Sequence, residues 1–186
     1  MSDSTAPGFL APAAAPVVLE DPDLTDLVQS VVAGITGIAL FYVRPRWQPT
    51  PPVQPAADID WCAVGITLRR DEGGLPYIEH AAAGLGTDTL LRHQVLDVLA
   101  SFYGPNAGAL ADRLFDGLWI SQNRETLLLA DAALVGADDV LTLTEAINGV
   151  FVPRADLGFQ IRRQRRRSYP VRNLLEAPFN LEADPP

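Results

Sequence analysis

Several residue types on which common functional sites depend are scarce in this sequence. The 186 residues include one cysteine, two histidines and no lysine. A single cysteine, Cys62, excludes an internal disulfide and a zinc site built from cysteines. The two histidines, His80 and His93, have no second histidine at the spacing of a helical metal motif. We therefore expect surface or hydrogen-bonded histidines, and we predict no metal and no cofactor.

Long hydrophobic runs are also missing. The most apolar stretch, residues 31–43, has thirteen residues, contains two glycines and is followed by Arg44. A membrane-spanning helix needs about twenty apolar residues, so we expect no contact with a membrane. The N-terminus has no basic region ahead of an apolar core, and a secretion signal is therefore not expected.

The sequence contains no set of residues typical of a catalytic centre. The segment GLGTD, residues 84–88, lacks the lysine and the spacing of a phosphate-binding loop. Asp138 and Asp139 are adjacent, and neighbouring side chains of a strand point to opposite faces. Cys62 lies in an apolar stretch without an adjacent base, which predicts a buried, inert thiol. These observations favour a structural or binding role, and we predict that the protein is not an enzyme.

Charge of opposite sign is concentrated in different parts of the chain. All fourteen basic residues are arginines, against twenty-three acids. Residues 154–172 contain seven arginines and one acid, Asp156, so this segment carries a charge of +6. The rest has seven arginines and twenty-two acids, a charge of −15, which accounts for the −9 of the whole chain. Such separation indicates an electrostatic partner.

The N-terminal part of the sequence predicts an arm followed by a helix. Residues 1–20 are rich in alanine and proline without hydrophobic periodicity, and are expected to form a flexible arm. Asp21 and Pro22 are typical of a helix start, with the aspartate as cap and the proline in the first turn. The helix should end between Gly34 and Gly37.

A proline-rich segment and a hairpin are expected next. Five prolines between residues 43 and 55 exclude a helix or a central strand. This segment should run extended along the surface, with Trp47 as its anchor. Residues 59–68 predict a strand that is buried on both faces. After a turn at residues 70–74, residues 75–83 should return as the second strand of a hairpin.

Two helices are expected in the middle of the chain. The first should run from Thr87 or Asp88 to Gly104, and the second should begin at Pro105 and end near Gly117. The apolar stripe of the first is Leu91, Val95, Val98 and Phe102. The inward residues of the second are Ala107, Leu110, Leu114 and Leu118.

The C-terminal part predicts two further strands. Residues 121–130 should form a short helical turn, and residues 132–143 a strand with a bulge at Asp138–Asp139. Residues 144–149 are expected to form a turn or short helix. The final strand is residues 154–171.

These elements predict an α+β fold, with an antiparallel sheet of about four strands packed on two or three helices. A single domain is expected over residues 21–179, including the proline-rich extended segment 43–55. The arm of residues 1–20 precedes this domain, and a tail of residues 180–186 follows it.

The final strand changes character along its length. In extended geometry Leu157, Phe159 and Ile161 share one face, which should pack on the core. The same face continues with three arginines, and the opposite face carries two more in the second half. We therefore expect the strand to leave the core after Ile161. Its arginines then need water, phosphate or carboxylate groups, because an unpaired buried charge is costly.

Three interpretations of this arginine strand remain open. It could meet acidic side chains of another protein, since the guanidinium fork suits carboxylates. It could bind nucleic-acid phosphates, as a binding module without sequence readout. Alternatively, the charges could only protect an exposed sheet edge against aggregation.

Four segments together resemble the phage neck terminator proteins, a tail-completion family of tailed bacteriophages. They are VRPRWQPTPP, DWCAVGI, LRHQVLDVLASFYGPNAGALADRLFDGLWISQNRETLLLA and RADLGFQIRRQRRRSYPV. The resemblance extends from about residue 23 to residue 179. The motifs are specific as a set, and each alone would be weak.

This resemblance implies a structural virion protein without catalysis or cofactor. Tail terminators commonly form hexameric rings that cap the tail tube, stop its polymerisation and join the tail to the head-side connector. The implied partners are other copies of this chain, the tail-tube proteins with sheath proteins as a further candidate, and the head-side neck proteins. Genomic DNA would pass through the lumen without sequence-specific contacts. The implied location is the neck of the virion, after assembly in the host cytoplasm.

The residues expected to contact another subunit, a partner or DNA in the lumen combine the basic strand with the proline-rich segment. They are Arg44, Arg46, Trp47, Arg162, Arg163, Arg165, Arg166, Arg167 and Tyr169.

Overall fold

The computed structural model describes residues 9–14, 19–50, 52–81, 86–147 and 149–172. They belong to two compact units, each with its own internal contacts. We call the larger unit, residues 19–73 and 93–164, the body. The smaller unit takes its described residues from 9–14, 74–81, 86–92 and 165–172, and we call it the ribbon.

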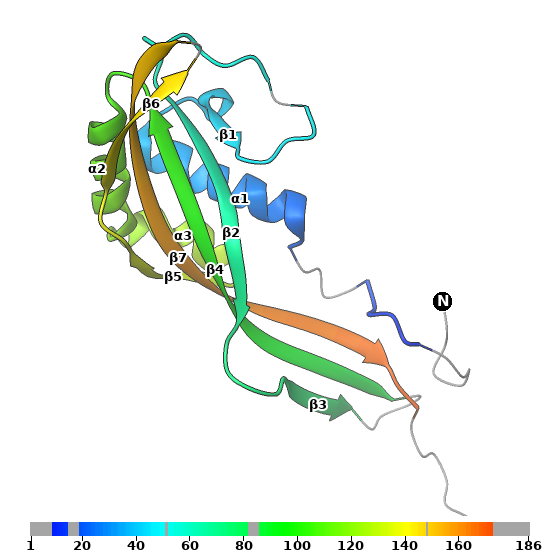
Figure 1. The fold of residues 1–186 in the computed structure, drawn as a ribbon. Coiled ribbons are helices and arrows are strands. Elements are labelled where there is room, and N and C mark those ends of the chain that lie inside the picture. The colour runs from blue at the N-terminus through cyan, green and yellow to red at the C-terminus, as the bar shows by residue number, and fades with distance from the viewer. Residues whose placement is uncertain (1–8, 15–18, 51, 82–85, 148, 173–186) are drawn as a thin grey trace, which may run out of the picture. The chain divides into compact units, whose positions relative to one another are not determined.

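The described residues contain three α-helices and seven strands, labelled in Figure 1. The helices are α1 (Asp21–Thr36), α2 (Ala107–Leu118) and α3 (Glu125–Leu129). The strands are β1 (Val43–Pro45), β2 (Trp61–Asp71), β3 (Tyr77–Ala81), β4 (Thr87–Tyr103), β5 (Ala132–Ala137), β6 (Leu141–Ile147) and β7 (Val150–Pro170). Short 3₁₀ turns occupy Leu40–Tyr42 and Gln122–Arg124.

The sheet is mixed, which corrects the expectation of about four antiparallel strands. The strand order is β1-β2-β4-β7-β5, with β3 paired to β4 and β6 paired to β7. β1 runs parallel to β2, whereas the β2–β4, β3–β4, β5–β7 and β6–β7 pairs are antiparallel. The α+β class is confirmed. The expected number of strands was too low for three reasons. Residues 87–103, expected to be a helix, and residues 43–45, expected to be extended only, pair with neighbouring strands, and the expected bulged strand is divided into β5 and β6.

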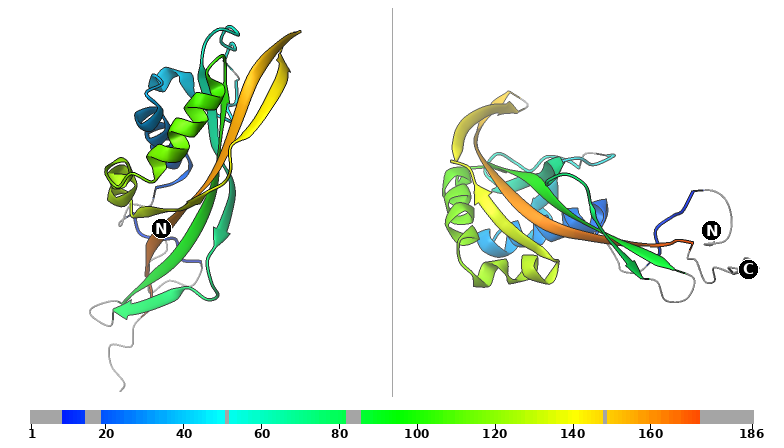
Figure 2. Two further views of the ribbon diagram at one scale, coloured as in Figure 1. Left: turned by 90° about the vertical axis from the view of Figure 1, so that its left-hand side faces the viewer. Right: turned by 90° about the horizontal axis from the view of Figure 1, so that it is seen from below.

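The core of the body lies between one face of the sheet and the helices. Figure 2 shows the helices on one side of this sheet. Side chains on that face come from alternate positions of β2, β4 and β7, as the two-residue period of a strand requires. The fully buried ones include Cys62, Val64, Ala100, Phe102, Leu157 and Phe159. Burial of this apolar surface is the main stabilisation of the body.

The helices α1 and α2 agree with the sequence analysis. The start of α1 at Asp21 and its end at Thr36 were expected, with Gly37 in the left-handed conformation that a helix end favours. The helix is preceded by Glu20 rather than capped by the Asp21 side chain. In α2 the four expected inward residues are all buried.

The helix expected between residues 87 and 104 is wrong, because this segment is β4. The buried side chains alternate along its second half: Gln94, Leu96, Val98, Ala100 and Phe102. Val98 and Phe102 belong both to this two-residue pattern and to the four-residue stripe, so the apolar positions fit either period. The segment forms a strand and not a helix because it pairs with β2 on one side and with β7 on the other.

The expected hairpin is also wrong in its pairing. Residues 77–81 do form a strand, β3, but its partner is the start of β4 rather than β2. β2 continues to Asp71, and its whole length pairs with the second half of β4. Residues 82 and 83 of the expected strand lie outside the described residues.

The segment from 132 to 149 contains two strands instead of a bulged strand and a turn. β5 ends at Ala137 and β6 begins at Leu141, and both pair with β7. The Asp138 backbone donates to the Gly158 carbonyl over 2.8 Å at the break between them. β6 continues to Ile147, so the turn or helix expected from residue 144 is wrong.

Residues 43–68 agree with the sequence analysis only in part. Three residues of the proline-rich segment pair with β2 as a short edge strand, and the rest of its described residues are not in strands or helices. β2 is buried at Cys62 and Val64 on the face that points to the core. Its other face is half-buried at Trp61 and Ala63 and buried at Gly65, and the strand is exposed from Thr67 onward.

The ribbon contains β3, the first half of β4 and the end of β7. The Val171 backbone donates to the Gly86 carbonyl over 3.3 Å, and Thr89 and Ser168 share a hydroxyl hydrogen bond of 3.2 Å. A further backbone bond joins Ala13 to Ser168 over 2.7 Å. Among the described residues of the ribbon, only Gly86 is buried. The ribbon therefore has paired backbone groups but no apolar core of its own.

Several expectations fall on other parts of the chain. Of the expected arm, residues 1–8 and 15–18 lie outside the described residues, and so does the whole tail of residues 180–186. The single domain over residues 21–179 stays a prediction. Within the described ranges, no helix is both long and apolar enough to cross a membrane.

Candidate functional site

The face of the body's sheet opposite the helices carries a row of polar and aromatic side chains. The register of β2 and β4 pairs Trp61 with Tyr103 and Ala63 with Ser101. Opposed residues of an antiparallel pair project to the same face. Cys62, between these positions, points into the core and is fully buried. We call this surface the helix-free face.

Arg154 of β7 forms hydrogen bonds with three side chains of the helix-free face. It forms a two-pronged contact with Asp156, from Nε to Oδ1 and from Nη2 to Oδ2, each over 2.8 Å. Its Nη1 donates to Glu145 of β6 over 2.8 Å, and Nη2 also approaches the Ser101 hydroxyl at 3.4 Å. The hydrogen bond to Asp156 raises the pKa of the Arg154 guanidinium, with a smaller contribution from Glu145. Two carboxylates therefore hold this arginine in place.

Two aromatic rings lie beside this cluster. Trp61 and Tyr103 stack with their centroids 4.3 Å apart and their planes within 10° of parallel. The Arg154 guanidinium lies 5.5 Å from the Tyr103 ring centroid, within the range of a cation–π contact. Burial raises the pKa of the Tyr103 hydroxyl, and the nearby Arg154 opposes this shift.

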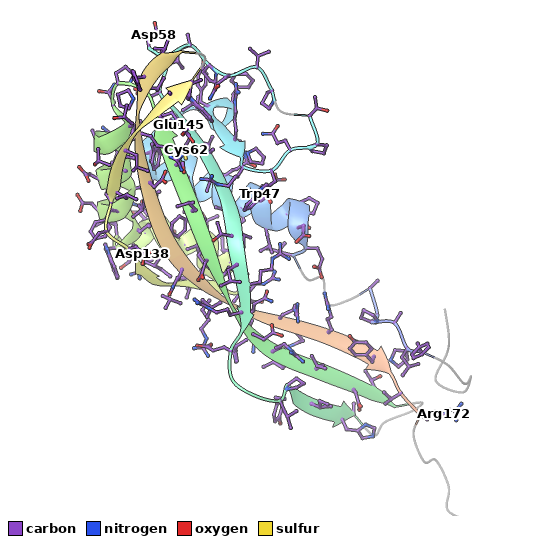
Figure 3. All side chains as sticks on the ribbon, in the orientation of Figure 1. Trp47, Asp58, Cys62, Asp138, Glu145 and Arg172 are labelled. Carbon is purple, nitrogen blue, oxygen red and sulfur yellow. The ribbon has the colours of Figure 1, made fainter. Side chains whose placement is uncertain are left out.

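The segment after β1 brings two arginines and a tryptophan to the same face. Arg46 donates from Nη2 to the hydroxyl of Ser101. The Trp47 ring packs so closely over Gly65 that a Cβ atom there would lie 2.8 Å from the ring. Arg44 donates to the Val53 carbonyl over 2.8 Å and lies 5.9 Å from the Trp61 centroid. Figure 3 marks Trp47 next to β2 and Glu145 on β6.

Two adjoining hollows follow from this arrangement. One has a volume of about 640 Å³ and is lined by Trp47, Trp61, two arginines and several prolines of residues 44–54. The other, of about 230 Å³, is lined by Trp61 together with Ile147, Val150 and Val152. Gln54 and Trp61 border both. We call the larger hollow the Trp47 groove. A groove of this kind, aromatic with arginine donors at its wall, suits an extended, proline-containing and acidic chain.

Two of the predicted arginines in the final strand find their partners inside the body. Arg162 pairs with Glu72, from Nε to Oε2 over 2.5 Å. Arg163 is buried, with 5% of its surface exposed, and donates to Gln94 and to the Leu19 carbonyl. The expectation that the strand leaves the core after Ile161 is therefore wrong, because Arg163, the next residue on the same face, is also buried. Polar groups of the body solvate Arg163.

The remaining candidates lie in the ribbon. Arg165 and Arg167 are half-buried, as is Tyr169, whereas Arg166 is exposed. The structure thus divides the nine candidates: Arg44, Arg46 and Trp47 share the helix-free face, Arg162 and Arg163 are held within the body, and the other four belong to the ribbon. Their contacts with another molecule stay predictions.

The other chemistry-bearing residues occupy structural positions. His80 of β3 lies 2.6 Å from Asp88, whereas His93 lies on β4 and not on a helix as expected. Cys62 is fully buried, and burial raises the pKa of its thiol far above the ordinary value. Asp138 and Asp139 lie between β5 and β6. In the part of the chain that the structure describes, no three His, Cys, Asp or Glu side chains form a group that could hold a metal.

Sequence reasoning missed Ser101, Tyr103 and Glu145 as members of the helix-free face. Ser101 is completely buried, and its hydroxyl oxygen accepts hydrogen bonds from Arg46 and Arg154. Because residues 87–104 were expected to be helical, Ser101 and Tyr103 could not be placed on one face. The sequence contains no clear signal for this face, because Val95 and Leu99 share it with Asp97 and Ser101, and polar and apolar residues therefore do not alternate along the strand.

Comparison with known proteins gives one family. The model of a family described as "Phage neck terminator protein" matches residues 22–184. A search of curated proteins finds no match. The matched range covers the body from residue 22 onward and most of the chain that contributes to the ribbon.

Proposed function

Because the chain belongs to the phage neck terminator family, and is thus a structural protein of the bacteriophage neck, we propose that its copies form a ring that caps the tail tube. The ring stops polymerisation of the tube and joins the tail to the head-side connector. We further propose a six-membered ring, assembled in the host cytoplasm, with the genome passing through its lumen.

The observation that carries this proposal is that the described residues of the ribbon form no apolar core. β3 pairs with β4 alone and lies at the edge of the ribbon, and each of its residues is exposed. Isolated ribbons of two or three strands are marginally stable unless an apolar face is covered. Tyr77 and Ile78 of β3 are 66% and 54% exposed. A neighbouring subunit that covers this surface would supply the missing stabilisation.

Charge also favours contact between copies. The body contains nine arginines and seventeen acids, a charge of −8, whereas the described residues of the ribbon contain five arginines and two acids, a charge of +3. The other residues of the ribbon's unit, at the two ends of the chain, add four acids and no arginine. A closed ring of identical subunits needs two different, complementary surfaces on each copy. A basic ribbon and an acidic body provide such a pair.

The same charge distribution suits a lumen through which DNA slides. Affinity for duplex DNA rises with the number of phosphates that basic side chains neutralise. An acidic body contributes few such contacts, so it would let DNA pass without retaining it.

Mass photometry of the purified protein, alone and with tail-tube subunits, tests the ring. The informative variant carries Arg165→Glu, Arg166→Glu and Arg167→Glu. We expect the wild-type chain to assemble at moderate salt and the variant to remain a folded monomer. Arg166→Glu and Arg124→Glu form a matched pair, since each reverses one charge, in the ribbon and in the body respectively. Unchanged assembly of the triple variant, judged against circular dichroism of its fold, would refute the role of the ribbon.

Direct binding of nucleic acid is the second candidate function. The exposed Arg166 within a run of three arginines is the observation that favours it. If the ribbon binds phosphates, the isolated protein should bind duplex DNA with an affinity that falls steeply as salt rises. The same triple variant would then lose DNA binding while ring formation continues.

A further inference from the structure

The Trp47 groove has the composition of a surface that binds an extended peptide. Two tryptophans and the prolines of the segment after β1 line it, and Arg44 and Arg46 supply charge. Trp47 is 62% exposed although its ring is fixed against Gly65. Fixed, exposed aromatic rings with prolines beside them are typical of surfaces that bind proline-containing chains.

The Arg46 guanidinium at the wall of the groove has only part of its hydrogen bonds satisfied. Its Nη2 is bonded to Ser101, but its Nε atom is buried and has no hydrogen-bond partner within the described residues. A buried donor without an acceptor costs free energy. Arg46 therefore brings to the wall of the groove a guanidinium that Ser101 satisfies only in part.

We propose that the Trp47 groove binds the acidic C-terminal segment, residues 173–186, of a second copy of this chain. The proposal rests on the proposed ring, because it needs neighbouring copies. The segment contains Glu176, Glu182 and Asp184 and no basic residue, and its sequence combines three prolines with leucines and a phenylalanine. This composition matches a groove of tryptophans, prolines and arginines in both charge and polarity.

Composition also separates this segment from the other proline-containing end of the chain. Residues 1–14 are alanine-rich and contain two prolines and a single acid, Asp3. They offer one carboxylate to the two arginines of the groove, whereas residues 173–186 offer three. Charge complementarity therefore selects the C-terminal segment.

The length of the segment fits an exchange between copies. Fourteen residues span up to about 45 Å when extended. In a ring, each copy would donate one segment and accept one, as a head-to-tail interface requires.

Disulfide trapping between full-length variants tests the proposal. One protein carries Gln48→Cys, at the wall of the groove, and the other carries Ala183→Cys. We expect the mixture to form disulfide-linked heterodimers under mild oxidation, since Cys62 is buried and does not compete. Ala109→Cys on the exposed surface of α2 replaces Gln48→Cys in the control mixture and should give at least fivefold less product.

Neutralising the segment provides the second arm. The changes Glu176→Gln, Glu182→Gln and Asp184→Asn, added to Ala183→Cys, should lower the trapped yield at least fivefold. A yield that stays unchanged would overturn the electrostatic argument. A third protein carries both Gln48→Cys and Ala183→Cys, and a disulfide that forms within this chain but not between the two single variants would overturn binding to a second copy. If the protein forms rings but gives no disulfide-linked product, this proposal is refuted and the proposed function is not. If the protein never associates, the proposed function is refuted as well.

Discussion

Arg163 donates from Nε and Nη2 to the amide oxygen of Gln94, over 3.0 and 2.8 Å, in the interior of the body. Both side chains are 5% exposed. Gln94 in turn donates to Asp71 at 3.2 Å, and Arg163 also reaches the Leu19 carbonyl. Segments from three parts of the chain therefore meet at one buried guanidinium.

Gln94→Ala should destabilise the body, because it removes the acceptor of a buried charge. A hydrogen bond to a charged group contributes about 1.5–3 kcal/mol, and an unsatisfied partner adds to the cost. We expect the free energy of unfolding in urea to fall by about 2 kcal/mol. Gln160→Ala, at a half-buried position of β7, is the control and should cost well under half as much. Equal losses for the two variants would show that the Arg163–Gln94 contact contributes nothing particular.

Two glycines of α2 should respond to alanine in opposite directions. At Gly108 no atom lies within 4 Å of an added Cβ, so the alanine should stabilise the helix by about 0.5–1 kcal/mol. At Gly117 the Cβ would overlap the Cγ2 methyl of Ile35 on α1. Overpacking of this kind costs about 1–3 kcal/mol, which exceeds the gain in helix propensity. Thermal unfolding of the two variants measures both signs, and stabilisation by Gly117→Ala would contradict the observed α1–α2 contact.

Cys62 should make stability fall at alkaline pH. Burial raises the pKa of its thiol above the ordinary 9.0, so the folded state keeps a proton that the unfolded state loses. The contribution is therefore fully present below pH 9 and is lost progressively as pH rises above it, by up to about 1.4 kcal/mol per pH unit. Urea unfolding at pH 8 and pH 10 should show a smaller loss for Cys62→Ala than for wild type. The raised pKa of Tyr103 acts in the same direction and leaves part of the slope.

Hydrogen exchange should separate the ribbon from the body in the unassembled protein. Amides of β3 pair with β4, but no apolar core protects them. We expect them to exchange much faster than amides of β2 between Cys62 and Ile66, which lie in the sheet over the core. Assembly should slow the exchange of β3 and leave β2 unchanged. Equal protection of both strands in the monomer would show that the ribbon is stable by itself.

Prediction from sequence succeeded where one pattern had one explanation. The proline and acids at the start of α1 and the glycines at its end define the helix locally. In α2, Leu110, Leu114 and Leu118 recur at the spacing of a helix face, between Pro105 before the helix and Gly117 near its end. β7 was expected because Leu157, Phe159 and Ile161 alternate with polar residues. β4 was missed because Val98 and Phe102 satisfy both periods, and only its two neighbouring strands exclude a helix.

The candidate site was predictable in its components but not in its assembly. Arg44, Arg46 and Trp47 stood out as charged and aromatic residues in a proline-rich segment. Their proximity to Ser101 and Trp61 depends on the parallel pairing of β1 with β2, which joins residues distant in sequence. Arg163 was expected to seek an external anion, because nothing in the sequence places Gln94 and the Leu19 carbonyl beside it.

By itself, the sequence determined the α+β class, the family, the absence of a lysine-based or cysteine-based site and the segregation of charge. These follow from composition and from local periodicity, which act over a few residues. Only the tertiary structure decided which arginines are held inside the body and which belong to the ribbon. A guanidinium is satisfied by whatever acceptors the fold brings within about 3 Å, and those acceptors come from distant parts of the chain.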